Sequence, residues 1–315
     1  MTESPSPLEG LVQHVLDADE INVLVATSKK RDDPVEFHRL QFGEELQEEF
    51  RDAALVVLDD PDDVILVPYD AVYQPAFGEL LCLRLDDAPR VEELIRDAVD
   101  VSACADFHPE DSLIRQLRFY VTVISDEERD AAFFRAFTSS KELTRRKGFV
   151  AVFEEGVFEK VTHKTFLFDD DADCFSWNGY LFIRHKSAFE RIFRYLDELR
   201  RAADETLDNV LQYVPVSNEA EFREACKGQI QMLAKLASVS RKPYLTDLTI
   251  DIIEETIGAF ELNVVVQDQN GAKRLVFDPS TQESRWAILK LLDDDYLQSV
   301  MTEEKYEATS KIRVR

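Results

Sequence analysis

The spacing of apolar residues in the first third of the chain predicts a mixture of strands and helices. Residues 21–27 form a mainly apolar run rich in β-branched side chains, which is typical of a buried strand. Phe42, Leu46 and Phe50 follow one another at intervals of four, on one face of a helix. Pro89 suits the first turn of a helix, because that position needs no backbone N–H donor. The expected elements are helices over residues 8–18, 42–54 and 89–99, and strands over 21–27, 64–67 and 80–85.

Turn dipeptides containing glycine predict three hairpins in the rest of the chain. Asn178-Gly179 and Asn270-Gly271 suit a two-residue turn, since both positions tolerate positive φ. Residues 155–156 supply a third turn between two short apolar runs. The hairpins are expected within residues 148–161, 172–183 and 263–277.

Longer apolar periodicities predict helices between and after these hairpins. Residues 117–124 indicate a strand, after which Ser125 and Glu128 have the spacing of a capping box and predict a helix start. Strands in hairpins together with amphipathic helices predict an α+β fold with mixed sheets, arranged in two lobes. The remaining helices are expected over residues 187–209, 219–239, 247–258 and 282–292.

Composition places the chain among globular proteins that stay in the cytoplasm. The longest stretches without a charged residue are ten residues, residues 174–183 and 209–218, whereas a membrane helix needs about 20 apolar residues. The first ten residues lack the basic and apolar regions of a secretion signal. Four scattered cysteines without a C-x-x-C pair are typical of reduced, buried thiols.

Charge is distributed unevenly along the chain. The net charge is −26, which disfavours phosphate binding by the chain as a whole. Residues 1–115 carry 9 basic and 28 acidic side chains, whereas residues 116–201 carry 15 of each. We therefore expect an acidic N-terminal α/β domain over residues 1–115 and a C-terminal α+β domain over residues 116–315.

Two acidic runs could bind a divalent cation through carboxylate oxygens, or could keep a loop solvated. The first run comprises Asp169, Asp170, Asp171 and Asp173, and it lacks the glycine and distal glutamate of a calcium-binding helix-loop-helix motif. The second, residues 293–295, follows a predicted helix whose dipole disfavours negative charge, so another group must hold it. We expect neither a metal nor a cofactor.

No catalytic motif is recognisable in the sequence. The five histidines are not at metal-ligand spacing, and 9 glycines leave little room for a phosphate-binding loop. Glu154, Glu155, Glu159 and Lys160 superficially resemble a nuclease site, but charged residues that end a hairpin have the same pattern. A binding protein is therefore favoured over an enzyme. The alternative is a metal-dependent nuclease that uses Asp170, Asp171 or Asp173.

The densest group of basic residues lies in the middle of the chain, where it could neutralise several phosphates or pair with nearby acids. It begins near the end of a predicted helix, and the hairpins that follow could extend the same surface. We expect this surface to bind DNA. Its residues are Lys141, Arg145, Arg146, Lys147, Lys160, Lys164, Arg184 and Lys186.

Two stretches carry a resemblance to a known family. The first is residues 179–183 followed by residues 189–195, and the second is residues 291–299 followed by Thr302, Tyr306, Ser310 and Lys311. Over residues 116–315 the chain resembles the KwaB-like family of the Kiwa anti-phage defence system.

The resemblance implies a DNA-binding subunit that acts with a membrane-embedded KwaA-like partner. The partner is expected to sense phage at the envelope and to recruit this chain, which would block phage DNA replication and transcription. A homodimer is expected, because a two-fold pair is the commonest closed assembly. A third interpretation is an acidic protein-interaction or DNA-mimic module in the first third of the chain.

Overall fold

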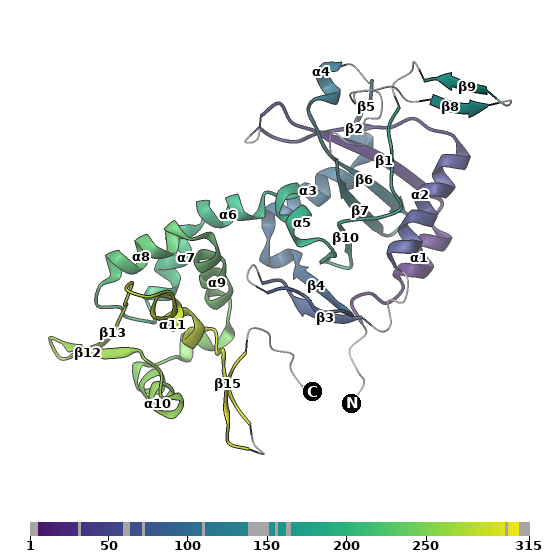
Figure 1. Cartoon of the computed structure of the whole chain (residues 1–315). Coiled ribbons are helices and arrows are strands. Elements are labelled where there is room, and N and C mark those ends of the chain that lie inside the picture. The colour runs from purple at the N-terminus through teal and green to yellow at the C-terminus, as the bar shows by residue number, and fades with distance from the viewer. Residues whose placement is uncertain are drawn as a thin grey trace. The chain divides into compact units, whose positions relative to one another are not determined.

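The computed structural model describes residues 6–30, 33–58, 64–70, 73–108, 111–137, 151–154, 157–161, 165–299 and 302–308. Its contacts divide the chain into two compact units (Figure 1). Unit 1 comprises Met1–Pro68 and Ala76–Tyr195, and unit 2 comprises Tyr69–Pro75 and Leu196–Arg315.

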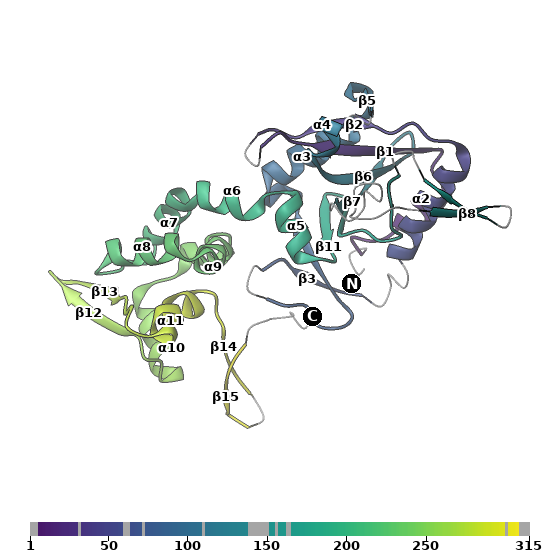
Figure 2. The ribbon, with the colours of Figure 1, turned by 45° about the horizontal axis from the view of Figure 1, so that its top comes forward.

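Unit 1 is built on a nine-stranded mixed sheet in the order β3-β4-β11-β10-β7-β6-β1-β2-β5 (Figure 2). The two outer pairs, β3 with β4 and β2 with β5, are parallel, and the strands between them pair antiparallel. The strands are β1 Glu20–Thr27, β2 Glu36–Arg39, β3 Ile65–Pro68, β4 Glu79–Arg84, β5 Ala105–Asp106, β6 Leu117–Ser125, β7 Asp130–Ala136, β10 Cys174–Trp177 and β11 Tyr180–Ile183.

Helices cover both faces of this sheet, so its central strands are buried on both sides. On one face, α1 (Leu11–Asp17) and α2 (Glu44–Val57) pack over Val23, Tyr120 and Phe133. On the other face, α3 (Pro89–Val99) and α5 (Lys186–Ile192) contact β7, where Phe134 meets Phe193 edge to face. Burial on both faces explains why β1 and β6 are mainly apolar and do not alternate regularly between apolar and polar residues.

The strand β1 pairs with β6 along almost its whole length. The boundary expected at residue 115 therefore falls inside unit 1, just before β6. Separate roles for the acidic first segment and the following residues stay a prediction. The short helix α4 (Asp111–Ile114) precedes this position, and the hairpin of β8 (Ala151–Glu154) and β9 (Val157–Lys160) forms a separate two-stranded sheet.

The helix predicted to begin at Ser125 is wrong. Residues 126–129 form the turn of the β6–β7 hairpin, in which Asp126 Oδ1 accepts the amide protons of Glu128 and Arg129, each at 2.8 Å. An aspartate that bonds the amides two and three residues ahead favours a turn as readily as a helix start. In this chain the pairing of β6 with β7 makes the segment a turn.

The continuous helix predicted over residues 187–209 is also wrong, because the structure divides it into α5, α6 (Tyr195–Arg201) and α7 (Ala203–Leu211). Arg194 interrupts the helix with a left-handed φ of 52°. Its guanidinium donates to Asp33 O at 2.9 Å and to Ser28 Oγ at 3.1 Å, far away in the sequence. These contacts hold a conformation that local periodicity cannot reveal.

Unit 2 is mainly helical. Its central helix is α9 (Ile230–Ser240), which packs against α7, α8 (Glu219–Gly228) and α11 (Gln282–Leu292). The single helix predicted over residues 219–239 is therefore two helices, separated by the extended backbone of Gln229. The remaining elements are α10 Ile250–Phe260, β12 Val265–Gln269, β13 Ala272–Val276, β14 Tyr296–Gln298 and β15 Lys305–Glu307.

The α+β class is confirmed, and so are the three hairpins and the helix over residues 282–292. No helix in the described part of the chain is long and apolar enough to span a membrane.

All four cysteines are unpaired; Cys174 and Cys226 are buried, and Cys82 and Cys104 are partly exposed. Burial raises the pKa of the Cys226 thiol to about 12, so this group stays a neutral thiol at neutral pH.

Candidate nucleic-acid interface

The structure locates three of the eight residues expected to bind DNA. Lys160 is exposed at the end of β9, Arg184 is exposed directly after β11, and Lys186 is the partly exposed first residue of α5. The other five lie outside the described residues, and they are Lys141, Arg145, Arg146, Lys147 and Lys164.

The backbone after β11 brings Arg184 close to the first acidic run. The amides of Arg184 and His185 both donate to the carbonyl of Asp173 at 2.9 Å, which joins the two ends of the β10–β11 hairpin. The type of turn explains the closeness of the two ends, since Asn178 and Gly179 adopt φ values of 47° and 77°. A cation after β11 therefore lies beside the carboxylates before β10.

A partly buried ion cluster forms where these segments meet β7. Arg135, whose side chain is 20% exposed, binds Asp169 at 2.8 Å, Asp171 at 3.0 Å and Asp173 at 2.7 Å. Arg184 forms a second ion pair with Asp171. Three carboxylates of the first acidic run, those of Asp169, Asp171 and Asp173, thus share two arginines as partners.

Asp173 lies at the centre of the cluster, with its side chain only 6% exposed. Its Oδ2 accepts the amide proton of Ala136 at 2.7 Å, and its Oδ1 lies 3.0 Å from His185 Nδ1. The carboxylate therefore fixes the end of β7 relative to β10 and β11. This is a structural role that charge counting did not predict.

The cluster shifts the pKa of two neighbouring groups. Burial opposes the charge on Arg135, but its hydrogen bond to Asp169 and the nearby carboxylates outweigh burial and raise the pKa of the guanidinium. Burial is the main cause that raises the pKa of Tyr120. The hydrogen bond that its hydroxyl donates to Asp169 at 2.7 Å raises this pKa further. Both groups therefore keep their protons at any physiological pH.

Arg135 was not among the residues singled out from the sequence. The signal that could have found it is a charged residue that follows the apolar run of residues 131–134 in the strand, since a charge in such a place is usually paired. The described residues contain no group of three or more His, Cys, Asp or Glu side chains placed to hold a metal ion.

The second acidic run is held by lysines of unit 2, as its position at a helix end required. Lys235 Nζ lies 2.5 Å from Asp293 and 2.8 Å from Asp295, and all three side chains are less than 9% exposed. Lys242 approaches Asp293 at 2.9 Å from the other side. Negative charge at the C-terminus of α11 is thereby compensated inside the unit.

Comparison with known proteins identifies the family. No curated protein and no solved structure matches the chain. The model of the family described as Kiwa protein KwaB-like matches residues 114–302, more than half of the chain, and this range contains the DNA-binding candidates and both acidic runs. The chain belongs to the Kiwa protein KwaB-like family and is a component of the Kiwa anti-phage defence system.

Proposed function

We propose that the chain is the DNA-binding effector subunit of its Kiwa system and acts with a membrane-embedded KwaA-like partner to block phage DNA replication and transcription. The observation that carries the proposal is the family match over residues 114–302, which includes every cation assigned to DNA. The proposed surface comprises Lys141, Arg145, Arg146, Lys147, Lys160, Lys164, Arg184 and Lys186.

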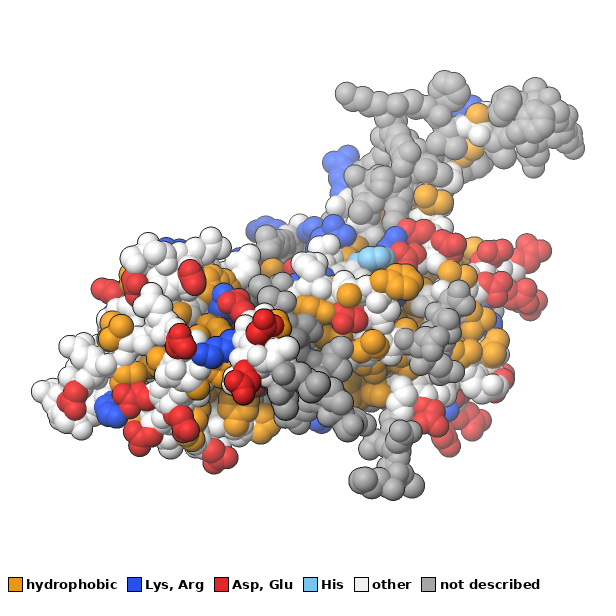
Figure 3. Space-filling model, turned by 60° about the horizontal axis from the view of Figure 1, so that its bottom comes forward, with side chains coloured by type: hydrophobic (Ala, Val, Ile, Leu, Met, Phe, Trp, Pro, Cys, Tyr) orange, Lys and Arg blue, Asp and Glu red, His pale blue; other side chains and the backbone are white. Residues whose placement is uncertain are grey.

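Charge distribution supports placing DNA on this segment. Residues 116–201 carry equal numbers of basic and acidic side chains, whereas residues 1–115 have an excess of 19 acidic ones, 28 against 9. Phosphates would be repelled by the acidic segment within the Debye length, about 8 Å at physiological salt. On the face shown in Figure 3, Asp and Glu side chains are spread widely and Lys and Arg side chains are fewer.

A salt titration tests the assigned surface. Changing Arg145, Arg146 and Lys147 together to Glu should weaken DNA binding and flatten its salt dependence, because each phosphate contact contributes roughly −0.9 to the log–log slope. Gel shifts of a short duplex between low and moderate salt measure both quantities. The matched control is the same six-unit change of charge at the exposed Arg84, Arg90 and Arg96 of the acidic segment.

The control variant should keep the wild-type slope, and the first variant should lose about two to three units of it. No binding by the wild type at low salt would contradict DNA binding. Equal effects of the two variants would contradict the assigned surface.

We assign the acidic segment to protein contacts, including recruitment to the partner. Cytoplasmic loops of membrane proteins are rich in Lys and Arg, which an acidic surface would attract. Four exposed glutamates gather in the first half of α2, so changing them to Gln should reduce recruitment. They are Glu44, Glu45, Glu48 and Glu49.

Co-sedimentation of the full chain with membranes that contain the partner measures this recruitment. The control replaces four exposed glutamates of unit 2, namely Glu205, Glu221, Glu224 and Glu255. If the α2 variant sediments with these membranes as well as the wild type does, the assignment of the acidic segment to recruitment is contradicted. A truncation to residues 116–315 would be a poor test, because it removes β1, the strand that pairs with β6, from the sheet.

The oligomeric state of the full chain can be measured directly. Light scattering should give twice the mass of 36.3 kDa if the chain forms the proposed homodimer.

A metal-dependent nuclease is the alternative function, and incubation of plasmid with the protein and Mg²⁺ or Mn²⁺ separates it from binding alone. Cleavage that disappears when Asp170 is changed to Asn would favour the nuclease.

A further inference from the structure

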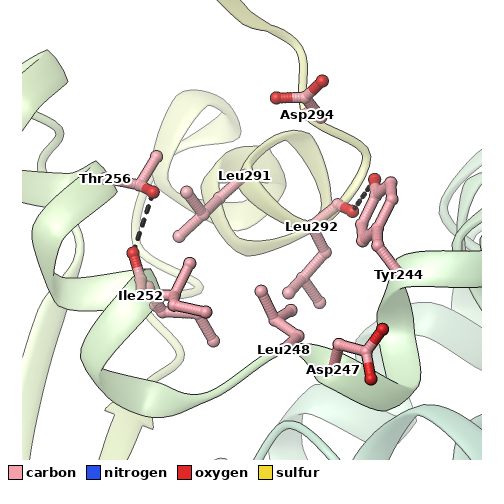
Figure 4. A pocket seen from close by; sticks show the side chains of 9 residues that line it. Tyr244, Asp247, Leu248, Ile252, Thr256, Leu291, Leu292 and Asp294 are labelled. Carbon is pink, nitrogen blue, oxygen red and sulfur yellow. Dashed lines mark hydrogen bonds between the residues drawn. The ribbon is translucent and has the colours of Figure 1, made fainter.

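Unit 2 contains an apolar cavity of about 330 Å³ that the proposed DNA surface does not use (Figure 4). It lies between the 3-10 turn Pro243–Asp247, α10 and the C-terminal end of α11. Its volume is at the lower end of the range for ligand-binding pockets in proteins. The apolar side chains that line it are Leu248, Ile252, Ile253, Leu291 and Leu292.

The base of the cavity is fixed by the surrounding structure. Ile253 and Leu292 are only 2% and 1% exposed, so they belong to the core of the unit. The Tyr244 hydroxyl donates to the Leu292 carbonyl at 2.9 Å, which ties the 3-10 turn to the end of α11 (Figure 4). The cavity is therefore preformed.

The mouth of the cavity exposes an apolar side chain to water. Ile252 is 47% exposed on the first turn of α10 and points into the hollow beside Leu248 and Leu291 (Figure 4). An exposed apolar group that continues a concave apolar surface is typical of an interaction site.

The charges at the rim indicate the chemistry of the partner. Asp247 and Asp294 are exposed at two ends of the hollow, and neither forms an ion pair with another described residue (Figure 4). Three lysines of the same unit already have acidic partners: Lys242 with Asp293, Lys273 with Glu254 and Lys305 with Glu261. The rim is therefore negative, and it would repel DNA and anionic lipid.

We propose that this cavity binds a protein segment that presents one apolar side chain between two basic residues. The apolar side chain fills the hollow and covers Ile252, while the flanking Lys or Arg side chains pair with Asp247 and Asp294. Burial of apolar area supplies most of the affinity, and the two carboxylates supply selectivity. The proposal concerns unit 2 alone and does not depend on DNA binding by unit 1.

The test is a titration of the full chain with a synthetic peptide, followed by the methyl resonances of Ile and Leu. The probe is acetyl-Arg-Ala-Leu-Ala-Arg-amide. It should shift the methyl signals of Ile252, Ile253 and Leu248 in a saturable manner. A peptide with Glu in place of both Arg, and one with Ser in place of Leu, should each bind on the order of fivefold more weakly or not at all.

Two variants distinguish the cavity from a non-specific acidic surface. Ile252→Arg places a cation across the mouth and should abolish the response, whereas Val265→Arg, an exposed apolar residue on β12, should leave it unchanged. Asp247→Asn with Asp294→Asn should remove the preference for the Arg peptide over the Glu peptide. All four positions are exposed, so the variants are expected to fold.

The proposal is overturned if no methyl in the cavity responds to the Arg peptide. It is equally overturned if the Glu peptide binds as well as the Arg peptide, or if vesicles of anionic lipid shift these methyls and the peptide does not.

Discussion

Replacing Lys235 with Met should lower the free energy of unfolding of unit 2 by about 3–5 kcal/mol. Lys235 is buried in α9 and neutralises both Asp293 and Asp295, whose side chains are only 8% and 7% exposed. The substitution removes the ammonium from beside both buried carboxylates, while Lys242 still faces Asp293. The cost arises mainly from the lost compensation of these two buried charges, since Met itself is a good core residue.

Tryptophan fluorescence during urea unfolding measures this loss. The chain has two tryptophans, Trp177 in unit 1 and Trp286 in unit 2, so a Trp177→Phe background reports unit 2. Lys227→Met is the matched control, because its ion pair with Asp204 is exposed and should contribute less than about 1 kcal/mol. Similar midpoints for Lys235→Met and Lys227→Met would contradict the account of the buried cluster.

The same cluster predicts how stability depends on pH. Burial opposes ionisation of Asp293. The hydrogen bonds and positive charges of Lys235, and to a smaller extent those of Lys242, outweigh burial and lower the pKa of this carboxyl. A lowered pKa stabilises the folded state above the unfolded value, about 4, and this contribution is lost as the pH falls further. The difference between wild type and Lys235→Met should therefore shrink from pH 7 to pH 3. A constant difference would contradict this linkage.

Replacing Arg135 with Met should lower the stability of unit 1 by about 2 kcal/mol. The cluster around Arg135 is more exposed than that around Lys235, so the value is reduced from that of a fully buried pair. The buried Asp173 would keep His185 and the Ala136 amide as partners. Urea unfolding followed by Trp177, in a Trp286→Phe background, measures the change.

Arg84→Met is the control for this variant, because Arg84 is 59% exposed and its ion pair with Asp86 is exposed as well. It should change stability by less than about 0.5 kcal/mol. If Arg135→Met is as stable as this control, the cluster does not hold β7, β10 and β11 together.

The features that the sequence predicted well are those specified by neighbouring residues. Asn178-Gly179 and Asn270-Gly271 define their turns through local φ preferences, and the hairpins form at these positions. The bounds of α11 agree with those predicted from its apolar periodicity, and the structure adds a local cap formed by Thr281 and Ser284.

The features that the sequence missed depend on distant contacts. Ser125 and Glu128 have a helix-start pattern, yet strand pairing turns the segment into a hairpin. Arg194 breaks a helix because it reaches residues near the end of β1. The pairing of Arg135 with the first acidic run required the order of strands in the sheet, which a single sequence does not reveal.

Amide hydrogen exchange of the full chain, with and without a saturating short DNA duplex, tests the central claim most directly. The proposed function predicts slower exchange in peptides that cover residues 141–186 when DNA is present, and unchanged exchange in peptides that cover residues 1–115. Protection confined to residues 1–115 or 202–315, or no protection anywhere under conditions of saturating DNA, would contradict it.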